Sequence, residues 1–207
     1  MNTVIFDFGG VLVDWDPWAL YKKVFENKGE FEKFLGDSRF YEWIERSDHG
    51  VRFDDIFEQI NASAPHCVEH ARIFQSRFME TIVGFQSGTV RVVEDLKNLQ
   101  VPLYGLTNWS AETFPPARDS HNVFTHFEDI IVSGVEKIAK PDPKIFELAV
   151  SRWNLSPQQT VFIDDRTENV EAARRIGMTG IVYQNSHDLR RELENYFPAL
   201  KKVSTHA

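Results

Sequence analysis

The chain has 207 residues, enough for one domain with a sizeable core. Apolar residues make up 42% of it and charged residues 26%, which is ordinary for a globular protein. There are 31 acidic residues against 23 basic ones, and the resulting net charge of −8 argues against broad binding to nucleic acids or anionic membranes, which requires a positive field.

The first predicted strand, Thr3–Phe8, is followed by a long segment without a convincing strand. Its helical patterns lie at Pro17–Asn27, Glu30–Leu35, Phe40–Ser47, Phe53–Asn61 and His66–Ile82. An insertion directly after the first strand of a parallel sheet lies above the carboxyl end of that strand, where ligands bind in open α/β sheets. We therefore predict a core of residues 1–14 and 84–207 and an all-helical cap of residues 15–83.

Short apolar runs and amphipathic helices alternate in the rest of the chain. Strands are predicted at Val101–Leu106, Asp129–Val132, Thr160–Ile163 and, more weakly, Thr179–Tyr183, and helices at Thr89–Leu99, Lys144–Trp153 and Glu168–Ile176. The runs lack strict polar alternation, as expected of strands that are buried on both faces. The pattern predicts an α/β fold with a doubly wound, Rossmann-like parallel sheet of about five strands.

Polar residues follow the first two strands of this predicted sheet. Asp7 comes directly after Val-Ile-Phe, and because an unpaired buried carboxylate is costly, it must lie at the open end of the strand or meet a cation. Gly9 and Gly10 let the backbone bend and bring its own carbonyl and N–H groups close to a ligand. Thr107 and Asn108 add a hydroxyl and an amide at the end of the next strand.

Two further segments bring charge to the same edge. Lys140 precedes a helix that begins with proline, and Asp164 and Asp165 end a strand, with Asn169 one helical turn later. Three carboxylates this close would repel one another unless a divalent cation held them, and Mg²⁺ prefers oxygen ligands. Lys140, Thr107 and backbone N–H groups could then hold a phosphate.

These segments resemble the four signature motifs of the haloacid dehalogenase (HAD) superfamily. They read Phe6-Asp7-Phe8-Gly9-Gly10-Val11-Leu12, Leu106-Thr107-Asn108, Lys140-Pro141-Asp142-Pro143, and Phe162-Ile163-Asp164-Asp165 with Asn169. They occur in the family's order, and the helical insertion is similar to the small C1-type cap between the first two motifs. The resemblance covers essentially the whole chain and implies a Mg²⁺-dependent phosphatase of a small phosphorylated metabolite.

The resemblance also implies a role for each matching residue. Asp7 would be the nucleophile that becomes an aspartyl-phosphate, and Lys140 would neutralise both the nucleophile and the phosphate. Substrate binding is implied for Gly10, Thr107, Asn108 and Lys140, and Mg²⁺ binding for Asp7, the backbone carbonyl of Gly9, Asp164 and Asp165. Most of the rate enhancement would then be electrostatic.

One position departs from the family pattern. Family phosphatases usually carry a second Asp two residues after the nucleophile as a general acid and base, and here that residue is Gly9. Such help is worth about 10²–10⁴-fold in rate. Three explanations are open: a substrate with a good leaving group, such as a sugar 1-phosphate or an acyl phosphate; a substitute such as Asp14, His49 or a water; or a different reaction.

Two alternatives to the phosphatase follow from this departure. The family's 2-haloacid dehalogenases also lack the second acid, but they need no metal and do not keep paired carboxylates, so Asp164-Asp165 favours the phosphatase. The combination of Asp-x-Gly with Asp-Asp is most similar to that of small sugar-phosphate phosphatases. The second alternative is a catalytically weak member that binds a phosphorylated ligand. Neither the substrate nor the oligomeric state can be predicted.

Redox and targeting patterns are sparse. Cys67 is the only cysteine and cannot form an intrachain disulfide. We find no signal-peptide pattern and no apolar run of membrane-spanning length, so the cytoplasm is the expected location.

Overall fold

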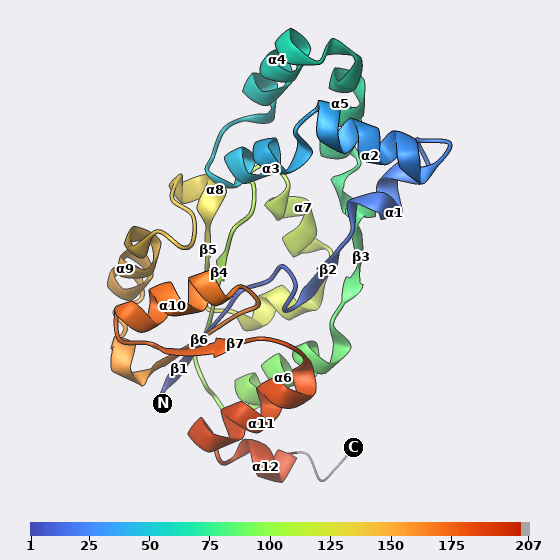
Figure 1. Cartoon of the computed structure of the whole chain (residues 1–207). Helices are drawn as coiled ribbons and strands as arrows, with labels where there is room; N and C mark the ends of the chain where they lie inside the picture. Colours follow the sequence, from blue (N-terminus) through green and yellow to red (C-terminus); the bar gives the residue numbers. More distant parts are fainter. Residues whose placement is uncertain (204–207) are drawn as a thin grey trace.

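A five-stranded parallel sheet forms the centre of the computed structural model, which describes residues 1–203 (Figure 1). In spatial order the strands are β5 (Asp129–Val132), β4 (Leu103–Thr107), β1 (Thr3–Phe6), β6 (Thr160–Asp164) and β7 (Thr179–Val182). The predicted α/β sheet is confirmed, and its strand ends differ from the prediction by no more than two residues. The chain builds outward from β1 to β5 and then returns to β6, which makes the carboxyl edge around β1 the switch point where ligands bind.

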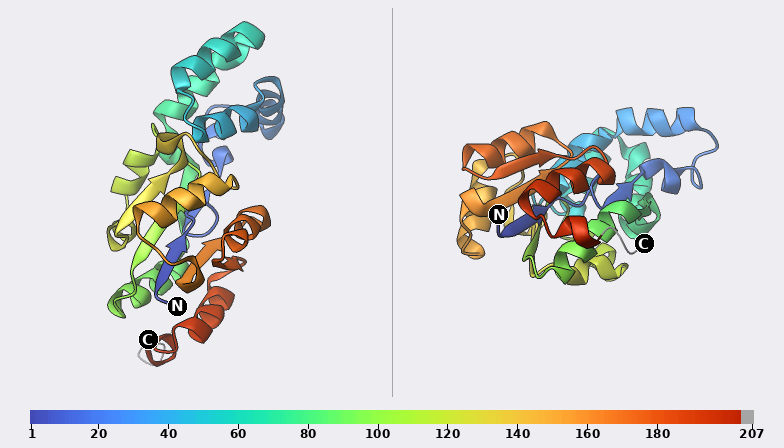
Figure 2. Two further views of the ribbon diagram at one scale, coloured as in Figure 1. Left: turned by 90° about the vertical axis from the view of Figure 1, so that its left-hand side faces the viewer. Right: turned by 90° about the horizontal axis from the view of Figure 1, so that it is seen from below.

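Helices cover both faces of this sheet. Val4 and Phe6 pack on one side, in a cluster that includes α6 (Ser87–Asn98) and α11 (Ser186–Tyr196). Ile5 packs on the other side against α9 (Pro143–Arg152) and α10 (Thr167–Arg175). The result is a three-layer α/β/α arrangement, seen from two further directions in Figure 2. These three β1 side chains are fully buried, which explains the absence of polar alternation.

The remaining core elements are short. They are α7 (Phe114–Asp119), α8 (Ser133–Glu136), α12 (Leu200–Val203) and the 3₁₀ turns η3 (Asn122–His126) and η4 (Pro157–Gln159). Of these, α8 directly follows the carboxyl end of β5 and therefore lies at the ligand-binding edge.

A helical insert stands above the carboxyl edge of the sheet (Figure 1). It comprises α1 (Pro17–Tyr21), α2 (Lys28–Asp37), α3 (Phe40–Asp48), α4 (Phe53–Ser63) and α5 (Val68–Ser76), with the 3₁₀ turns η1 (Pro65–Cys67) and η2 (Phe78–Thr81). The Asp16 side chain caps α1 by accepting from Trp18 N–H at 2.9 Å. Aromatic rings fill the interior of the insert; Phe40, which is fully buried, contacts Tyr21, Phe34, Trp43 and Phe74.

The chain enters and leaves the insert through two paired strands that were not predicted. β2 (Val13–Trp15) and β3 (Ile82–Phe85) form an antiparallel pair in which Val13 lies opposite Phe85. Both strands border a segment whose pattern is otherwise helical, and β2 has only three residues, so neither stands out as a strand. The predicted helices at both ends of the segment were accordingly too long: α1 ends at Tyr21, and the region from His66 to Ile82 divides into η1, α5 and η2 before β3. None of the helices within residues 1–203 combines the length and apolar character that a membrane crossing needs.

Candidate active site

Asp7 emerges at the carboxyl edge of the sheet because the ladder between β1 and β6 continues one residue past β1. The backbone N–H of Asp7 donates to the Ile163 carbonyl at 2.8 Å. The chain then turns sharply, and the Phe8 carbonyl accepts from the N–H groups of both Leu12 and Val13 at 2.8 Å. The turn leaves the Asp7 side chain in place while the backbone of the next two residues passes close to it.

Gly10 allows this turn to lie against Asp165. Its φ of +70° lies in the left-handed region, and a Cβ at this position would meet Asp165 Oδ2 at 2.4 Å. A side chain at residue 10 would therefore displace one of the predicted metal-binding carboxylates. At Gly9, in contrast, a Cβ would meet no atom within 4 Å.

Lys140 joins the ends of three strands. Its Nζ donates to Asp7 Oδ1 at 2.8 Å, to Asp164 Oδ2 at 2.7 Å and to the Leu106 carbonyl at 2.7 Å. The side chain of Asn108 fixes the Lys140 backbone, donating to its carbonyl and accepting from its N–H at 2.9 Å each. The buried ammonium group therefore has three acceptors in a fixed position.

Asp164 is held from the opposite side by the start of α10. Its Oδ1 accepts from the Arg166 N–H at 2.9 Å, and the Asn169 side-chain amide donates to Oδ1 and Oδ2 at 2.9 and 3.0 Å. Asp164 is completely buried, and these bonds, together with the one from Lys140, compensate for the loss of water around its charge.

The charged groups of this cluster shift one another's pKa values. Burial raises the pKa of Asp7 to about 7 although Lys140 opposes the shift, and the negative charge of Asp164 adds to it. Burial alone would lower the pKa of Lys140, but Asp164 and Asp7 outweigh it and raise that pKa. Burial and Asp164 likewise raise the pKa of Asp165. With all four groups ionised, three carboxylates and one ammonium carry a net charge of −2, which one divalent cation would balance.

The donor atoms fit a hard divalent cation. Carboxylate oxygens of Asp7, Asp164 and Asp165 all lie within 4.8 Å of one another, and Mg²⁺ selects oxygen ligands of this kind. Four buried side-chain polar atoms have no hydrogen-bond partner among the described residues, and two of them, Thr107 Oγ1 and Asn169 Oδ1, lie at this cluster. A phosphate oxygen beside Thr107 would satisfy the first, because a buried hydroxyl without a partner is costly.

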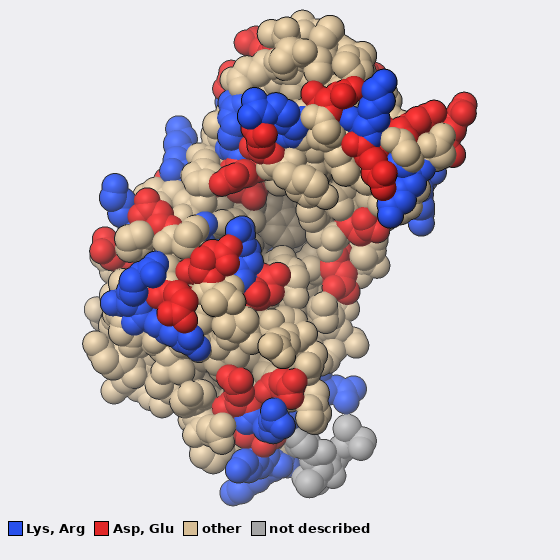
Figure 3. Space-filling view, viewed as in Figure 1, with Lys and Arg blue, Asp and Glu red and all other residues tan. Residues whose placement is uncertain are grey.

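A cavity of ≈ 750 Å³ connects this cluster with the helical insert, and Figure 3 shows its opening between the insert above and the core below. The core contributes Asp7, Gly9, Gly10, Asn108, Lys140 and Asp165 to the lining. Apolar side chains form much of the remaining wall, namely Val13, Trp15, Ile44, Phe53, Phe74, Phe78, Val83 and Trp109. The cavity therefore combines a charged floor with a largely apolar wall.

The structure brings every predicted site residue to this one place. Six of them line the cavity, while Thr107 and Asp164 are buried behind them at the ends of β4 and β6. The side chain of Asn108 holds the Lys140 backbone, and substrate binding at Asn108 stays a prediction.

The residues considered as substitutes for the missing acid also line the cavity. Asp14 Oδ1 accepts from Gln86 Nε2 at 2.7 Å, and the exposed His49 has its Nδ1 2.8 Å from the Glu45 carbonyl. Sequence reasoning missed Asp48, which lines the cavity beside His49. The available signal was an acid at the last position of a cap helix, two residues before Gly50, whose φ of +85° ends that helix.

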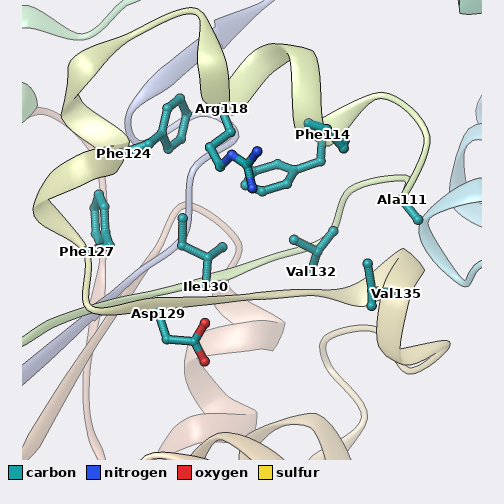
Figure 4. A pocket seen from close by; sticks show the side chains of 10 residues that line it. Ala111, Phe114, Arg118, Phe124, Phe127, Asp129, Ile130, Val132 and Val135 are labelled. Atoms are coloured by element: carbon teal, nitrogen blue, oxygen red, sulfur yellow. The ribbon is translucent and has the colours of Figure 1, made fainter.

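A second cavity, of ≈ 400 Å³, lies along β5 beneath α7 (Figure 4). Figure 4 shows apolar side chains around it, with Arg118 reaching in from α7 and Asp129 below the strand. Asp129 accepts from Trp153 Nε1 at 2.8 Å. None of the predicted site residues lines this cavity, so it is separate from the cluster around Asp7.

The family follows from a direct comparison. A family model for haloacid dehalogenase-like hydrolases matches residues 1–177. The chain belongs to the haloacid dehalogenase-like hydrolases. The resemblance of the four motifs to this family is thereby confirmed.

Individual relatives include phosphatases. A sesquiterpene phosphatase of Aspergillus oryzae is 29% identical over 182 residues, which cover 87% of this chain and 88% of the relative. A phosphorylated carbohydrates phosphatase of Thermotoga maritima is 26% identical over 212 residues, 98% of this chain and 94% of the relative.

Solved structures share the fold of this HAD hydrolase. The crystal structure of a HAD family enzyme from Bacteroides thetaiotaomicron has a TM-score of 0.74 at 18% identity, covering 93% of this chain and 98% of that one. The same enzyme has also been solved in complex with magnesium and inorganic phosphate, with a TM-score of 0.67 at 20% identity, covering 89% of this chain and 95% of that one. At these identities the likeness concerns the fold.

Proposed function

We propose that this HAD hydrolase is a Mg²⁺-dependent phosphatase that acts on a small phosphorylated metabolite through an aspartyl-phosphate on Asp7. The observation that carries the proposal is the convergence of Asp7, Asp164 and Asp165 around the buried ammonium of Lys140. When ionised, this set carries a net charge of −2, which one divalent cation would cancel. Two phosphatases among the relatives support the same reaction class.

Each residue has a distinct part in the proposed reaction. Asp7, the backbone carbonyl of Gly9, Asp164 and Asp165 would hold the metal, which when bound would offset negative charge on the transferring phosphoryl group. Lys140 fixes the Asp7 carboxylate through Oδ1 and adds a second positive charge at the phosphate.

Groups around the nucleophile position the phosphate. The Thr107 hydroxyl, which lacks a partner among the described residues, donates to a phosphate oxygen. The helical insert acts as a cap that keeps bulk water away while Asp7 attacks phosphorus.

The cavity wall favours a phosphate ester with an apolar or aromatic alcohol part. The space that this part would occupy is surrounded by the side chains of Trp15, Ile44, Phe53, Phe74 and Phe78. These side chains pack favourably against an apolar group and would gain little from a strongly hydrated one. A sugar 1-phosphate is the second candidate, favoured by the absence of an acid at Gly9, because such an ester has a better leaving group.

The geometry speaks against a dehalogenase. Asp7, Asp164 and Asp165 repel one another at short range, and Lys140 offsets only one of the three charges. A reaction without metal would leave this repulsion uncompensated. In a reaction that requires Mg²⁺, the bound ion would offset it.

The test is phosphate release from a panel of phenyl phosphate, a prenyl phosphate, sugar 1- and 6-phosphates and acetyl phosphate. We expect release that requires Mg²⁺, stops with EDTA and is lost in Asp7→Asn. Asp54→Asn, which removes an exposed carboxylate of α4, is the matched control and should retain full activity. Halide release from 2-haloacids without metal would support the dehalogenase instead, and thermal stabilisation by a phosphorylated compound without turnover would support a binding protein.

A further inference from the structure

We propose that Asp48 is the general acid and base of this reaction and takes the place of the second acid that the family carries at the position of Gly9. The proposal rests on the phosphatase function proposed above. Asp48 belongs to the insert, so the acid would come from the element that covers the substrate and not from the turn that carries the nucleophile.

Asp48 ends α3 and reaches the catalytic edge. It lines the same cavity as Asp7, Gly9 and Lys140. Its own carbonyl accepts from Ser133 Oγ at 2.5 Å, and the same hydroxyl accepts from the Trp109 N–H at 3.0 Å. The end of α3 is therefore fixed to the core through the backbone of Asp48.

Two glycines make this approach possible. A Cβ on Gly50 would lie 2.7 Å from the Gly134 carbonyl, and a Cβ on Gly134 would lie 2.5 Å from the Ala111 nitrogen. Side chains at these positions would push apart the end of α3, the helix α8 and the turn after β4. Because both residues are glycine, the three segments pack closely, and Asp48 at the end of α3 lies at the cavity.

The surroundings of Asp48 suit proton transfer near neutral pH. Burial raises its pKa to about 7, with further contributions from the negative charges of Asp7 and Glu45, while Lys140 and the Ser110 N–H oppose the shift. Burial is the largest of these causes, so the shift does not depend only on the charge of Asp7. A carboxyl group in this range can give up a proton and take one back at the working pH.

The two residues considered as substitutes for the missing acid are less suited. Asp14 is engaged by Gln86, and His49 is turned toward its own helix. The position that the family uses for its acid is an open space beside Gly9. That space leaves room for the leaving-group oxygen to meet a donor that comes from the insert.

Protons and bonds balance in both proposed steps. An Asp7 carboxylate oxygen forms a bond to phosphorus, the bond from phosphorus to the ester oxygen breaks, and that oxygen takes the proton of the Asp48 carboxyl group, releasing the alcohol. Water then attacks the phosphorus of the aspartyl-phosphate and gives a proton to the Asp48 carboxylate. The bond from phosphorus to Asp7 breaks, which releases inorganic phosphate and restores the Asp7 carboxylate and the protonated Asp48.

The test compares two esters of similar shape, phenyl phosphate and 2,4-dinitrophenyl phosphate, in the Asp48→Asn variant. Phenolate is a poor leaving group that needs a proton, so kcat for phenyl phosphate should fall about 10²–10⁴-fold. Dinitrophenolate leaves unprotonated, so the variant should release one equivalent of it per site in a burst. Turnover should then be slow, because no base activates water, and phosphorylated Asp7 should accumulate and be detected by mass.

Control variants separate this role from a structural one. Glu42→Gln removes an exposed carboxylate from the same helix and should behave like the wild type with both esters. Gly9→Asp in the Asp48→Asn background places a carboxyl group in the open space and should recover part of the phenyl phosphate activity. An equal loss with both esters, without a burst or phosphorylated enzyme, would overturn the role of Asp48, as would unchanged kinetics. Failure of the wild type to release phosphate from any ester would instead overturn the phosphatase function itself.

Discussion

Lys140 is the residue on which the buried charges of the site depend. Its ammonium group is the shared partner of Asp7 and Asp164, and both carboxylates are shielded from water. Removing one partner of a buried ion pair leaves the other charge uncompensated, which typically costs about 3–5 kcal/mol. In metal-free protein we expect Lys140→Met to lower the free energy of unfolding by this amount, measured with urea in EDTA.

The matched control for this variant is Lys144→Met, which removes an exposed lysine four residues further along the chain and should change stability by less than about 0.5 kcal/mol. Adding Asp7→Asn to Lys140→Met should restore part of the lost stability, because it removes one of the stranded charges. Equal unfolding free energies for Lys140→Met and Lys144→Met would contradict this arrangement of buried charges.

The raised pKa of Asp7 predicts a pH dependence of stability in the metal-free protein. The pKa is about 7 in the folded chain against an ordinary value of 3.8, so between these values the folded state holds a proton that the unfolded state has released. Stability therefore decreases as the pH rises from about 4 to about 7, by at most about 4 kcal/mol, and the loss is complete above that range.

The measurement is the difference in unfolding free energy between wild type and Asp7→Asn, followed from pH 4 to pH 8 in EDTA. The variant cannot titrate at residue 7, so the difference should shift in its favour as the pH rises. A difference that is independent of pH would show that Asp7 is ionised throughout and that Lys140 outweighs burial.

At the scale of elements, the sequence predicted those helices and strands whose local residue pattern is distinctive. The five strands of the sheet were predicted because each is an apolar run between helices, and their polar ends placed Asp7, Thr107 and Asp164 at one edge. The strands β2 and β3 were missed because their pairing joins residues about 70 positions apart in a segment whose pattern is otherwise helical. Asp48 was missed for a related reason: its position at the site depends on α3 docking against α8, and the acid near Gly50 at the end of a cap helix does not by itself indicate that contact.

Two glycines in helices should respond in opposite ways to replacement by alanine. Gly134 in α8 is packed against the turn after β4, so Gly134→Ala should destabilise the protein by about 1–3 kcal/mol and lower activity. A Cβ on Gly36 in α2 would meet no atom within 4 Å, so Gly36→Ala should stabilise by about 0.5–1 kcal/mol with no effect on activity. Thermal unfolding and phosphate release on both variants check this, and a stable, fully active Gly134→Ala would show that the turn and α8 can separate.

At the scale of the whole molecule, the net negative charge of the protein opposes the binding of an anionic substrate. A chain of net charge −8 does not attract phosphate by its overall field. Within that total, the local set of three carboxylates and Lys140 accounts for −2, which a bound divalent cation would cancel. We infer that the metal-loaded protein is the form that accepts substrate, and that the helical insert and the described part of the core enclose the substrate together.

Magnesium should therefore stabilise the entire fold, since it binds the folded chain and not the unfolded one. At a concentration 100 times its dissociation constant the gain is about 2.7 kcal/mol, which corresponds to a rise in Tm of about 5–10 °C for a chain of this length. Asp165→Asn should lose most of this rise without lowering the metal-free Tm, because desolvation and repulsion by Asp164 both disfavour the charge of Asp165.

Glu168→Gln is the control for the Asp165 variant, because it removes an exposed carboxylate three residues away that pairs with Arg166 and lies outside the cluster. Its magnesium-dependent rise in Tm should equal that of the wild type in a thermal scan with and without EDTA. If Asp165→Asn and the wild type rise equally, the ion binds elsewhere. The three carboxylates would then need another explanation for their closeness, since repulsion among like charges in a buried site opposes it.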